Sequence, residues 1–158
     1  MTGWLAWLEG TPAATAVRAS PWLYPALETL HILGLALLVG AAWTWDLRLL
    51  GAGRGVAVSE LARLALPAAR AGFGVAATSG AFLFASDAVA TAANPAFRAK
   101  LALIALAAVN AALFHRAYPS TAAWDREVRP PARARAAAML SLVLWSLAAT
   151  AGRLIAYL

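Results

Sequence analysis

The stretch from Pro21 to Trp45 decides the fold, and it is written PWLYPALETLHILGLALLVGAAWTW. A helix needs about 20 mostly apolar residues to cross the hydrocarbon core of a bilayer. This stretch is long enough, and Pro21 and Pro25 stand in its opening turns, where a missing N–H group does least harm. The sequence therefore predicts a membrane-spanning helix over 21–45.

Three further apolar stretches lie downstream, over 67–86, 97–114 and 134–157. Pro67 is expected to open the first of these, Asn94-Pro95 is a helix-start signal before the second, and Pro130-Pro131 precedes the third. Glycine and alanine recur through all the spans, and small residues let helices approach closely in lipid. The predicted fold class is all-α, a single-domain integral membrane four-helix up-down bundle over residues 1–158.

Composition supports the membrane interpretation. Hydrophobic residues make up 63% of the chain and charged residues only 13%, whereas soluble domains contain about 45–50% apolar residues and about a quarter charged. The absence of cysteine excludes disulfides, thiolate metal sites, iron–sulfur clusters and covalent c-type haem attachment. The net charge of +6 comes from residues scattered between the apolar stretches, so we expect no nucleic-acid partner.

The first 19 residues precede the spans. Met1–Gly10 reads MTGWLAWLEG and lacks the basic start and long apolar run of a cleavable signal peptide. With Trp4 and Trp7, this segment is typical of a short helix lying at the membrane–water interface. A frayed terminus is the alternative.

Basic residues are distributed unevenly about the predicted spans. Nine arginines flank the first and third connections: Arg48, Arg54, Arg63, Arg70, Arg116, Arg126, Arg129, Arg133 and Arg135. Four basic residues fall on the other side: Arg18, Arg98, Lys100 and Arg153. By the positive-inside rule, the two connections face the cytoplasm of a bacterial inner membrane and both termini face the periplasm.

Four ionisable residues are expected in the outer half of the bundle. Glu28 and His31 are three residues apart on the first span, and His31 lies roughly 15 Å from the outer helix end. Lys100 and Arg153 stand near the outer ends of the third and fourth spans. Ionisable residues inside a membrane are costly and commonly mark functional sites, so these four form one candidate pocket.

A b-type haem suits this set of residues. Imidazole is a common axial ligand of haem iron, which makes His31 the candidate ligand, with Glu28 available to orient it. Lys100 and Arg153 are placed to meet the two propionates near the water boundary. The alternative is an interhelical polar network that fixes helix packing and holds no cofactor.

A second polar group is expected near the cytoplasmic face, comprising Asp46, Arg48, Arg70, Asn110 and His115. His115 lies roughly 27 Å down its helix from Phe97, about 12 Å deeper than His31, so the two imidazoles do not suit one iron. His115 is therefore interpreted as interfacial, and Asp46 and Arg48 as helix-end ion pairs. The sixth ligand of a haem is left open, either vacant or supplied by His31 of a second protomer in a symmetric dimer.

Several segments resemble a family of small, functionally uncharacterised bacterial membrane proteins. The resemblance lies in PALETLHILGLALLVGAAWTWDLRLLG, GFGVAATSGAFLFASDA, NPAFRAKLALIALAAVN and GRLIAY, which together cover nearly the whole chain. His31, Lys100 and Asn110 resemble the copper-resistance protein D membrane domain. His31 and Lys100 are also similar to the bacterial membrane protoporphyrinogen oxidase family, although the surrounding residues depart from its pattern and His115 is a loose counterpart of its second histidine. These resemblances imply that His31 is a haem ligand and Lys100 an essential cation.

The leading hypothesis is a small membrane protein that binds haem b and acts in electron transfer or as a redox-linked subunit. A cofactor-free scaffold or accessory protein is the second hypothesis, and a small ion- or metal-handling transporter is the third. No phosphate-binding loop, HExxH motif or nucleophile elbow is present, and Ser79 and Ser86 are expected to lack a nearby base.

Overall fold

The computed structural model describes residues 3–125 and 129–158, and within these ranges the regular structure is entirely helical. Four long helices are apolar enough to cross a membrane: α3 (Leu23–Leu50), α4 (Val58–Ser86), α6 (Pro95–Ala117) and α7 (Ala132–Leu154). The shorter elements are α1 (Gly3–Glu9), α2 (Pro12–Ala19), α5 (Ala88–Ala93) and a 3₁₀ turn, η1 (Ala122–Trp124). The predicted all-α membrane bundle with four spans is confirmed.

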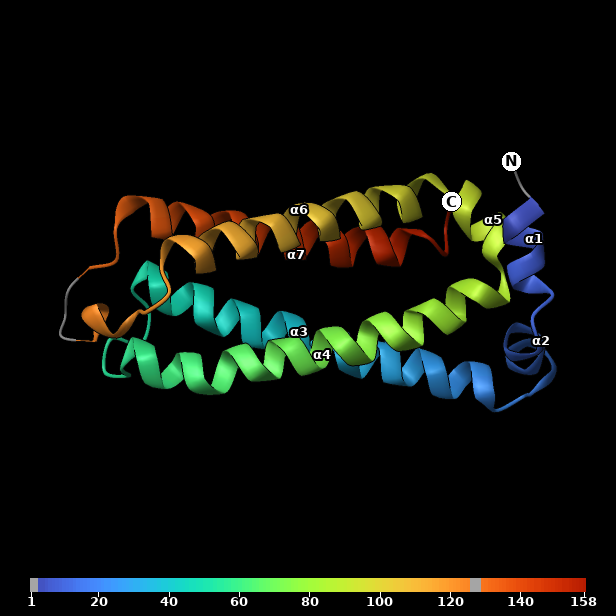
Figure 1. The fold of residues 1–158 in the computed structure, drawn as a ribbon, viewed down its shortest axis with the longest axis horizontal. Helices are drawn as coiled ribbons and strands as arrows, with labels where there is room; N and C mark the ends of the chain where they lie inside the picture. The colour runs from blue at the N-terminus through green and yellow to red at the C-terminus, as the bar shows by residue number, and fades with distance from the viewer. Residues whose placement is uncertain (1–2, 126–128) are drawn as a thin grey trace.

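The four spans run alternately up and down as two hairpins (Figure 1). Helix α3 packs along α4 and α6 packs along α7, while the hairpins meet where α3 contacts α7. The α3–α4 and α6–α7 connections lie at one end, and both termini lie at the other with α1, α2 and α5. We call the end with the two connections the loop end, and the end with the two termini the terminal end.

Two glycines bring the backbones of α3 and α4 together. A Cβ on Gly34 would stand 2.7 Å from the backbone N of Ala76, and one on Gly72 would stand 2.5 Å from that of Leu38. Only glycine fits such a contact, because any side chain would force the helices apart. This crossing fixes how α3 and α4 are rotated against each other.

Helix ends differ from the predicted bounds for identifiable reasons. Helix α3 continues past Trp45 to Leu50 because Gly51, at φ 112°, forms a left-handed cap whose N–H donates to the carbonyl of Arg48. Helix α4 begins at Val58, so the expectation that Pro67 opens it is wrong. Pro67 lies inside the helix, which membrane helices tolerate when their surroundings satisfy the freed backbone group. Asn94 does open α6, since its side-chain oxygen accepts from the N–H of Ala96 at 2.9 Å.

Carboxylates fasten both ends of the bundle. At the loop end, Asp125 accepts from the backbone N–H of Ser59 at 2.8 Å and from its hydroxyl at 2.6 Å, so it caps the start of α4. At the terminal end, Glu9 accepts from the N–H of Val89 at 2.7 Å, in the first turn of α5. Arg18 also donates to the carbonyl of Ser86 at 3.0 Å. The segment before the spans is thus two short helices docked on the α4–α5 corner.

The main apolar core lies near the loop end. Its buried members come from every span and from η1: Trp45, Leu49, Val58, Ala65, Phe114, Trp124, Ala134 and Ala138. Elsewhere the large side chains of the spans, such as Leu33 and Leu113, are mostly exposed, as a lipid-facing surface requires. Trp4, Trp7 and Trp22 are exposed at the terminal end.

Candidate functional site

His31 is held between α3 and α4 in a fixed orientation. Its Nδ1 lies 2.8 Å from the carbonyl oxygen of Ala76, on α4. A carbonyl can only accept, so Nδ1 carries the proton and donates it, and Nε2 is left with a free lone pair. Metal-ligating histidines are commonly oriented in this way through the nitrogen that does not bind the metal.

Gly80 makes the space that the imidazole fills. A Cβ at Gly80 would lie 2.8 Å from Cε1 and 3.1 Å from Nδ1 of His31. Because the ring lies directly against the α4 backbone, it cannot turn away without losing the bond to Ala76. Sequence spacing gave no indication of this contact, which joins residues 49 positions apart.

Ser79 lies next to this histidine, which corrects the expectation that it has no base nearby. Its Oγ is 3.3 Å from Nδ1 of His31. The hydroxyl donates instead to the carbonyl of Val75 at 2.7 Å, and Nδ1 is committed as a donor to Ala76. Proton abstraction from Ser79 by His31 is therefore not set up, and the serine is a packing residue of α4.

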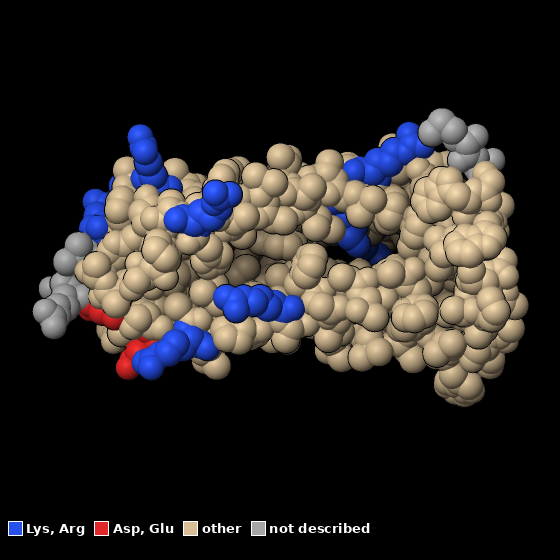
Figure 2. Space-filling model, in the orientation of Figure 1, with Lys and Arg blue, Asp and Glu red and all other residues tan. Residues whose placement is uncertain are grey.

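Lys100 approaches the same imidazole from α6. Its Nζ lies 3.5 Å from Nε2 of His31, at the long limit of a hydrogen bond that the ammonium donates. The lysine side chain crosses α7 over Gly152, where a Cβ would stand 3.2 Å from Nζ. Figure 2 shows a hollow between the two helix pairs, with Lys or Arg atoms inside it. His31 and Lys100 are thus brought together as expected from the sequence.

Glu28 and Arg153 lie apart from this pair. Glu28 is exposed, and within the described ranges its side chain makes no hydrogen bond or ion pair. Arg153 is also exposed and donates to the hydroxyl of Tyr157 at 2.8 Å, with its guanidinium over the tyrosine ring. The structure therefore assembles two of the four expected residues into one site.

The His31–Lys100 site suits a cofactor that brings its own metal more than a bare ion. Across the described residues, no group of three or more His, Cys, Asp or Glu side chains is placed to hold a metal ion. A haem supplies four ring nitrogens to its iron and needs only one or two ligands from the protein. Nε2 of His31 could serve as one such ligand, and the Lys100 cation beside it could meet a negatively charged group of the cofactor.

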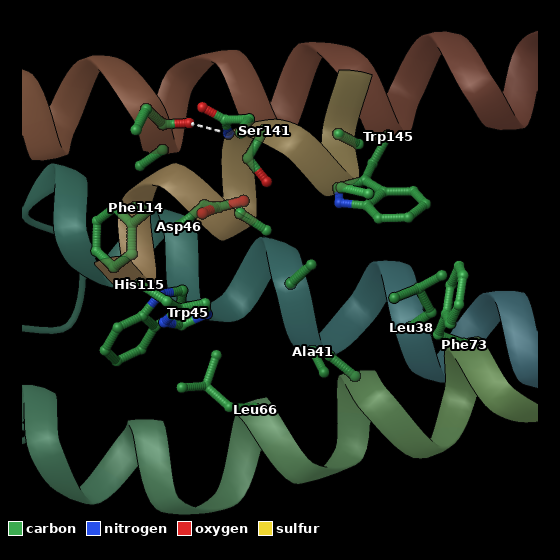
Figure 3. Close-up of a pocket in the computed structure, with 18 of the residues that line it drawn as sticks. Leu38, Ala41, Trp45, Asp46, Leu66, Phe73, Phe114, His115, Ser141 and Trp145 are labelled. Atoms are coloured by element: carbon green, nitrogen blue, oxygen red, sulfur yellow. Dashed lines mark hydrogen bonds between the residues drawn. The ribbon is translucent and has the colours of Figure 1, made fainter. Parts of the chain in front are cut away.

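A second polar site lies near the loop end, at a cavity of about 370 Å³ between α3, α4, α6 and α7 (Figure 3). Asp46, Arg70, Asn110, His115 and Ser141 contribute its polar groups. The first four were grouped by the sequence, whereas the cavity itself and Ser141 were missed. Gly51 was the available sequence signal, because a glycine commonly ends a helix. Its cap extends α3 to Leu50 and so places Asp46 within the span.

The interpretation of Asp46 and Arg48 as helix-end ion pairs is wrong. Arg48 is buried and donates from Nε to the carbonyl of Val56 at 2.7 Å, closing the α3–α4 connection. Asp46 is 5% exposed, and its Oδ2 has no hydrogen-bond partner among the described residues. The ion pair found in the described part of the chain is Arg63–Glu60, at 3.9 Å on the surface.

Fold and sites together define a multi-pass all-α membrane protein with one polar site in each half of the bundle. No protein family, curated protein or solved structure matches this chain.

Proposed function

We propose that this protein binds a b-type haem through Nε2 of His31 and acts in membrane electron transfer. The observation that carries the proposal is the 2.8 Å bond from Nδ1 to the carbonyl of Ala76, which leaves Nε2 as a free ligand atom. When bound, such a group supplies reversible one-electron chemistry at its iron. The chain contributes an oriented imidazole and a neighbouring cation, placed among apolar spans.

Lys100 is assigned to a haem propionate. Its ammonium lies 3.5 Å from Nε2, and its stem passes over Gly152, where the missing side chain leaves room for it. A charge-assisted hydrogen bond to a carboxylate is stronger than the long bond that it now makes to a neutral imidazole. Arg153, paired with Tyr157, and the exposed Glu28 are not assigned to the site.

A second ligand for the iron would come from another copy of the chain. Within the described ranges the other histidine, His115, lines the cavity near the loop end and is not available to the site at His31. Two copies related by a two-fold axis would supply two His31 imidazoles, and such symmetric dimers are the commonest oligomers. A five-coordinate iron is the alternative within the same proposal.

The proposed location is a bacterial inner membrane with both termini in the periplasm. The α3–α4 and α6–α7 connections lie together at the loop end. The sequence assigns nine of the thirteen basic residues to that side, of which Arg126 lies outside the described residues. Positive charge favours the cytoplasmic side of a membrane. The exposed Trp4, Trp7 and Trp22 would then lie at the periplasmic interface, where amphipathic rings accumulate.

One observation favours a second candidate function, that of a cofactor-free scaffold. Lys100 makes a long contact of 3.5 Å to Nε2 of His31, and this contact ties α6 to the α3–α4 hairpin. In that case the pair stabilises the bundle and binds nothing. The two candidates differ in what happens to haem.

The deciding experiment is an absorption spectrum of the detergent-purified protein after haem addition, oxidised and then reduced with dithionite. The wild type and the matched control His115→Ala should show a Soret band with sharp reduced α and β bands, and His31→Ala should lose them. A colourless wild type, or a full spectrum in His31→Ala, would reject haem ligation by His31. If both the wild type and His31→Ala stay colourless and the variant unfolds at a lower temperature, the scaffold is favoured.

A further inference from the structure

The cavity near the loop end has the size and lining of a ligand site. It measures about 370 Å³, within the range of about 300–1,000 Å³ that is typical of pockets for small molecules. All four spans line it, and most of the lining side chains are apolar, including Leu38, Leu66 and Ala107. Figure 3 shows the lining residues facing one another across the space between the spans.

The cavity wall contains a carboxylate without a counter-charge. Asp46 is 95% withdrawn from solvent, and in Figure 3 its side chain points between the helices toward α7, where Ser141 faces it. Oδ2 of Asp46 has no partner among the described residues. A buried carboxylate is costly to keep ionised unless it is paired, so a bound cation would stabilise the charged form of Asp46.

The two basic residues of the cavity do not supply that counter-charge. Arg70 and His115 line the same cavity from α4 and α6, but both are exposed side chains. Neither forms an ion pair with Asp46 within 4.0 Å. Both side chains are exposed, whereas Asp46 lies inside, so Asp46 is the ionisable group in the interior of the cavity.

Aromatic rings line the cavity together with this carboxylate. Trp45, Phe73, Phe114 and Trp145 all contribute to the wall. The face of an aromatic ring attracts an organic cation within about 6 Å of the ring centroid, and tryptophan does so most strongly. A lone buried carboxylate with aromatic walls is the chemistry that recognises an alkyl- or arylammonium group.

We propose that this cavity binds a lipophilic organic cation, with Asp46 as its counter-charge and the aromatic rings as its apolar contacts. A metal cation is disfavoured because the described residues offer no cluster of three metal-ligating side chains there. An anion is disfavoured because it would be placed against the buried carboxyl group of Asp46, the acidic side chain among the described lining residues. The inference does not rest on haem binding, since Asp46 is 15 residues from His31 along α3, or about 22 Å.

The test is equilibrium dialysis of radiolabelled tetraphenylphosphonium against purified protein in a non-ionic detergent, without haem. The wild type should bind the cation saturably. Asp46→Asn, which keeps the shape of the side chain, should weaken binding about tenfold or more, because it removes a desolvated charge pair. The matched control Asp87→Asn removes an exposed carboxylate outside the cavity and should bind like the wild type.

Two further measurements keep the test decisive if Asp46→Asn fails to fold. Triphenylphosphine oxide, a neutral analogue, should not displace the cation from the wild type. Arg70→Gln, which removes a positive charge from the rim, should tighten binding severalfold. Absence of saturable binding, equal binding by Asp46→Asn, or effective competition by the neutral analogue would each overturn the proposal.

Discussion

Nζ of Lys100 on α6 lies 3.5 Å from Nε2 of His31 on α3, although 69 residues separate them in the chain. The contact links the α3–α4 hairpin to α6 of the other hairpin in the terminal half of the bundle. It also places a cation beside the one imidazole whose other nitrogen is fixed by a backbone carbonyl. The first two predictions follow from this pair.

Lys100→Met should lower the affinity for haem without removing its spectrum at saturating haem. Loss of a charge-assisted hydrogen bond costs about 1.5–3 kcal/mol, so the dissociation constant should rise by about tenfold or more. Haem titration followed at the Soret band measures the change. Arg98→Met, which removes an exposed cation two residues earlier on α6, is the matched control and should leave the affinity unchanged. Equal affinities for all three proteins would show that Lys100 does not contact the haem.

Gly80→Ala should disturb the orientation of His31 because its new Cβ would lie 2.8 Å from Cε1 of the imidazole. The ring then has to shift, and its bond to the carbonyl of Ala76 weakens. Side-chain ¹⁵N NMR of the haem-free protein should show the Nδ1–H tautomer in the wild type and a mixture in the variant. Gly74→Ala, whose Cβ would meet nothing within 4 Å, is the control. Unchanged histidine shifts in Gly80→Ala would contradict this account of the site.

Gly72→Ala should destabilise the α3–α4 hairpin. Its Cβ would stand 2.5 Å from the backbone N of Leu38 and 2.8 Å from the carbonyl oxygen of Gly34, and rigid backbone cannot yield as a side chain can. Overpacking of this kind costs about 1–3 kcal/mol. Thermal unfolding in detergent, followed by tryptophan fluorescence, should show a lower midpoint than the wild type. Gly40→Ala, with open space around the new Cβ, should not lower it.

Asp125→Asn should destabilise the loop end in a pH-dependent manner. The Ser59 hydroxyl, and then the Ser59 backbone N–H, hold the pKa of the Asp125 carboxyl below its ordinary value of 3.8. A lowered folded-state pKa means that the ionised carboxylate stabilises the fold above pH 3.8, and that this contribution is lost as the pH falls through the lowered value. The difference in unfolding midpoint between the wild type and the variant should therefore be present near neutral pH and shrink below pH 3.8.

Asp87→Asn is the control for that measurement, because Asp87 is exposed at the terminal end. Its unfolding midpoint should follow that of the wild type at every pH. A constant difference between the wild type and Asp125→Asn across the whole range would show that the α4 cap does not depend on the charge of Asp125.

The sequence by itself determined the number and order of the spans. Each span is an apolar run of bilayer length, and breakers such as Asn94-Pro95 and Pro130-Pro131 separate them, so these features depend only on neighbouring residues. It also indicated which polar residues belong to which half of the bundle, because depth along a helix follows from residue number. Glu28, His31, Lys100 and Arg153 were grouped on that basis.

Only the tertiary structure decided which of those residues meet. In lipid, apolar side chains cover every face of a span, so the pattern does not reveal which face turns inward. That rotation is set by contacts between distant positions, chiefly Gly34 against Gly72. It brings His31 to Ala76, Gly80 and Lys100 and leaves Glu28 exposed, and the cap at Gly51 extends α3 far enough to enclose Asp46 in a cavity shared by all four spans.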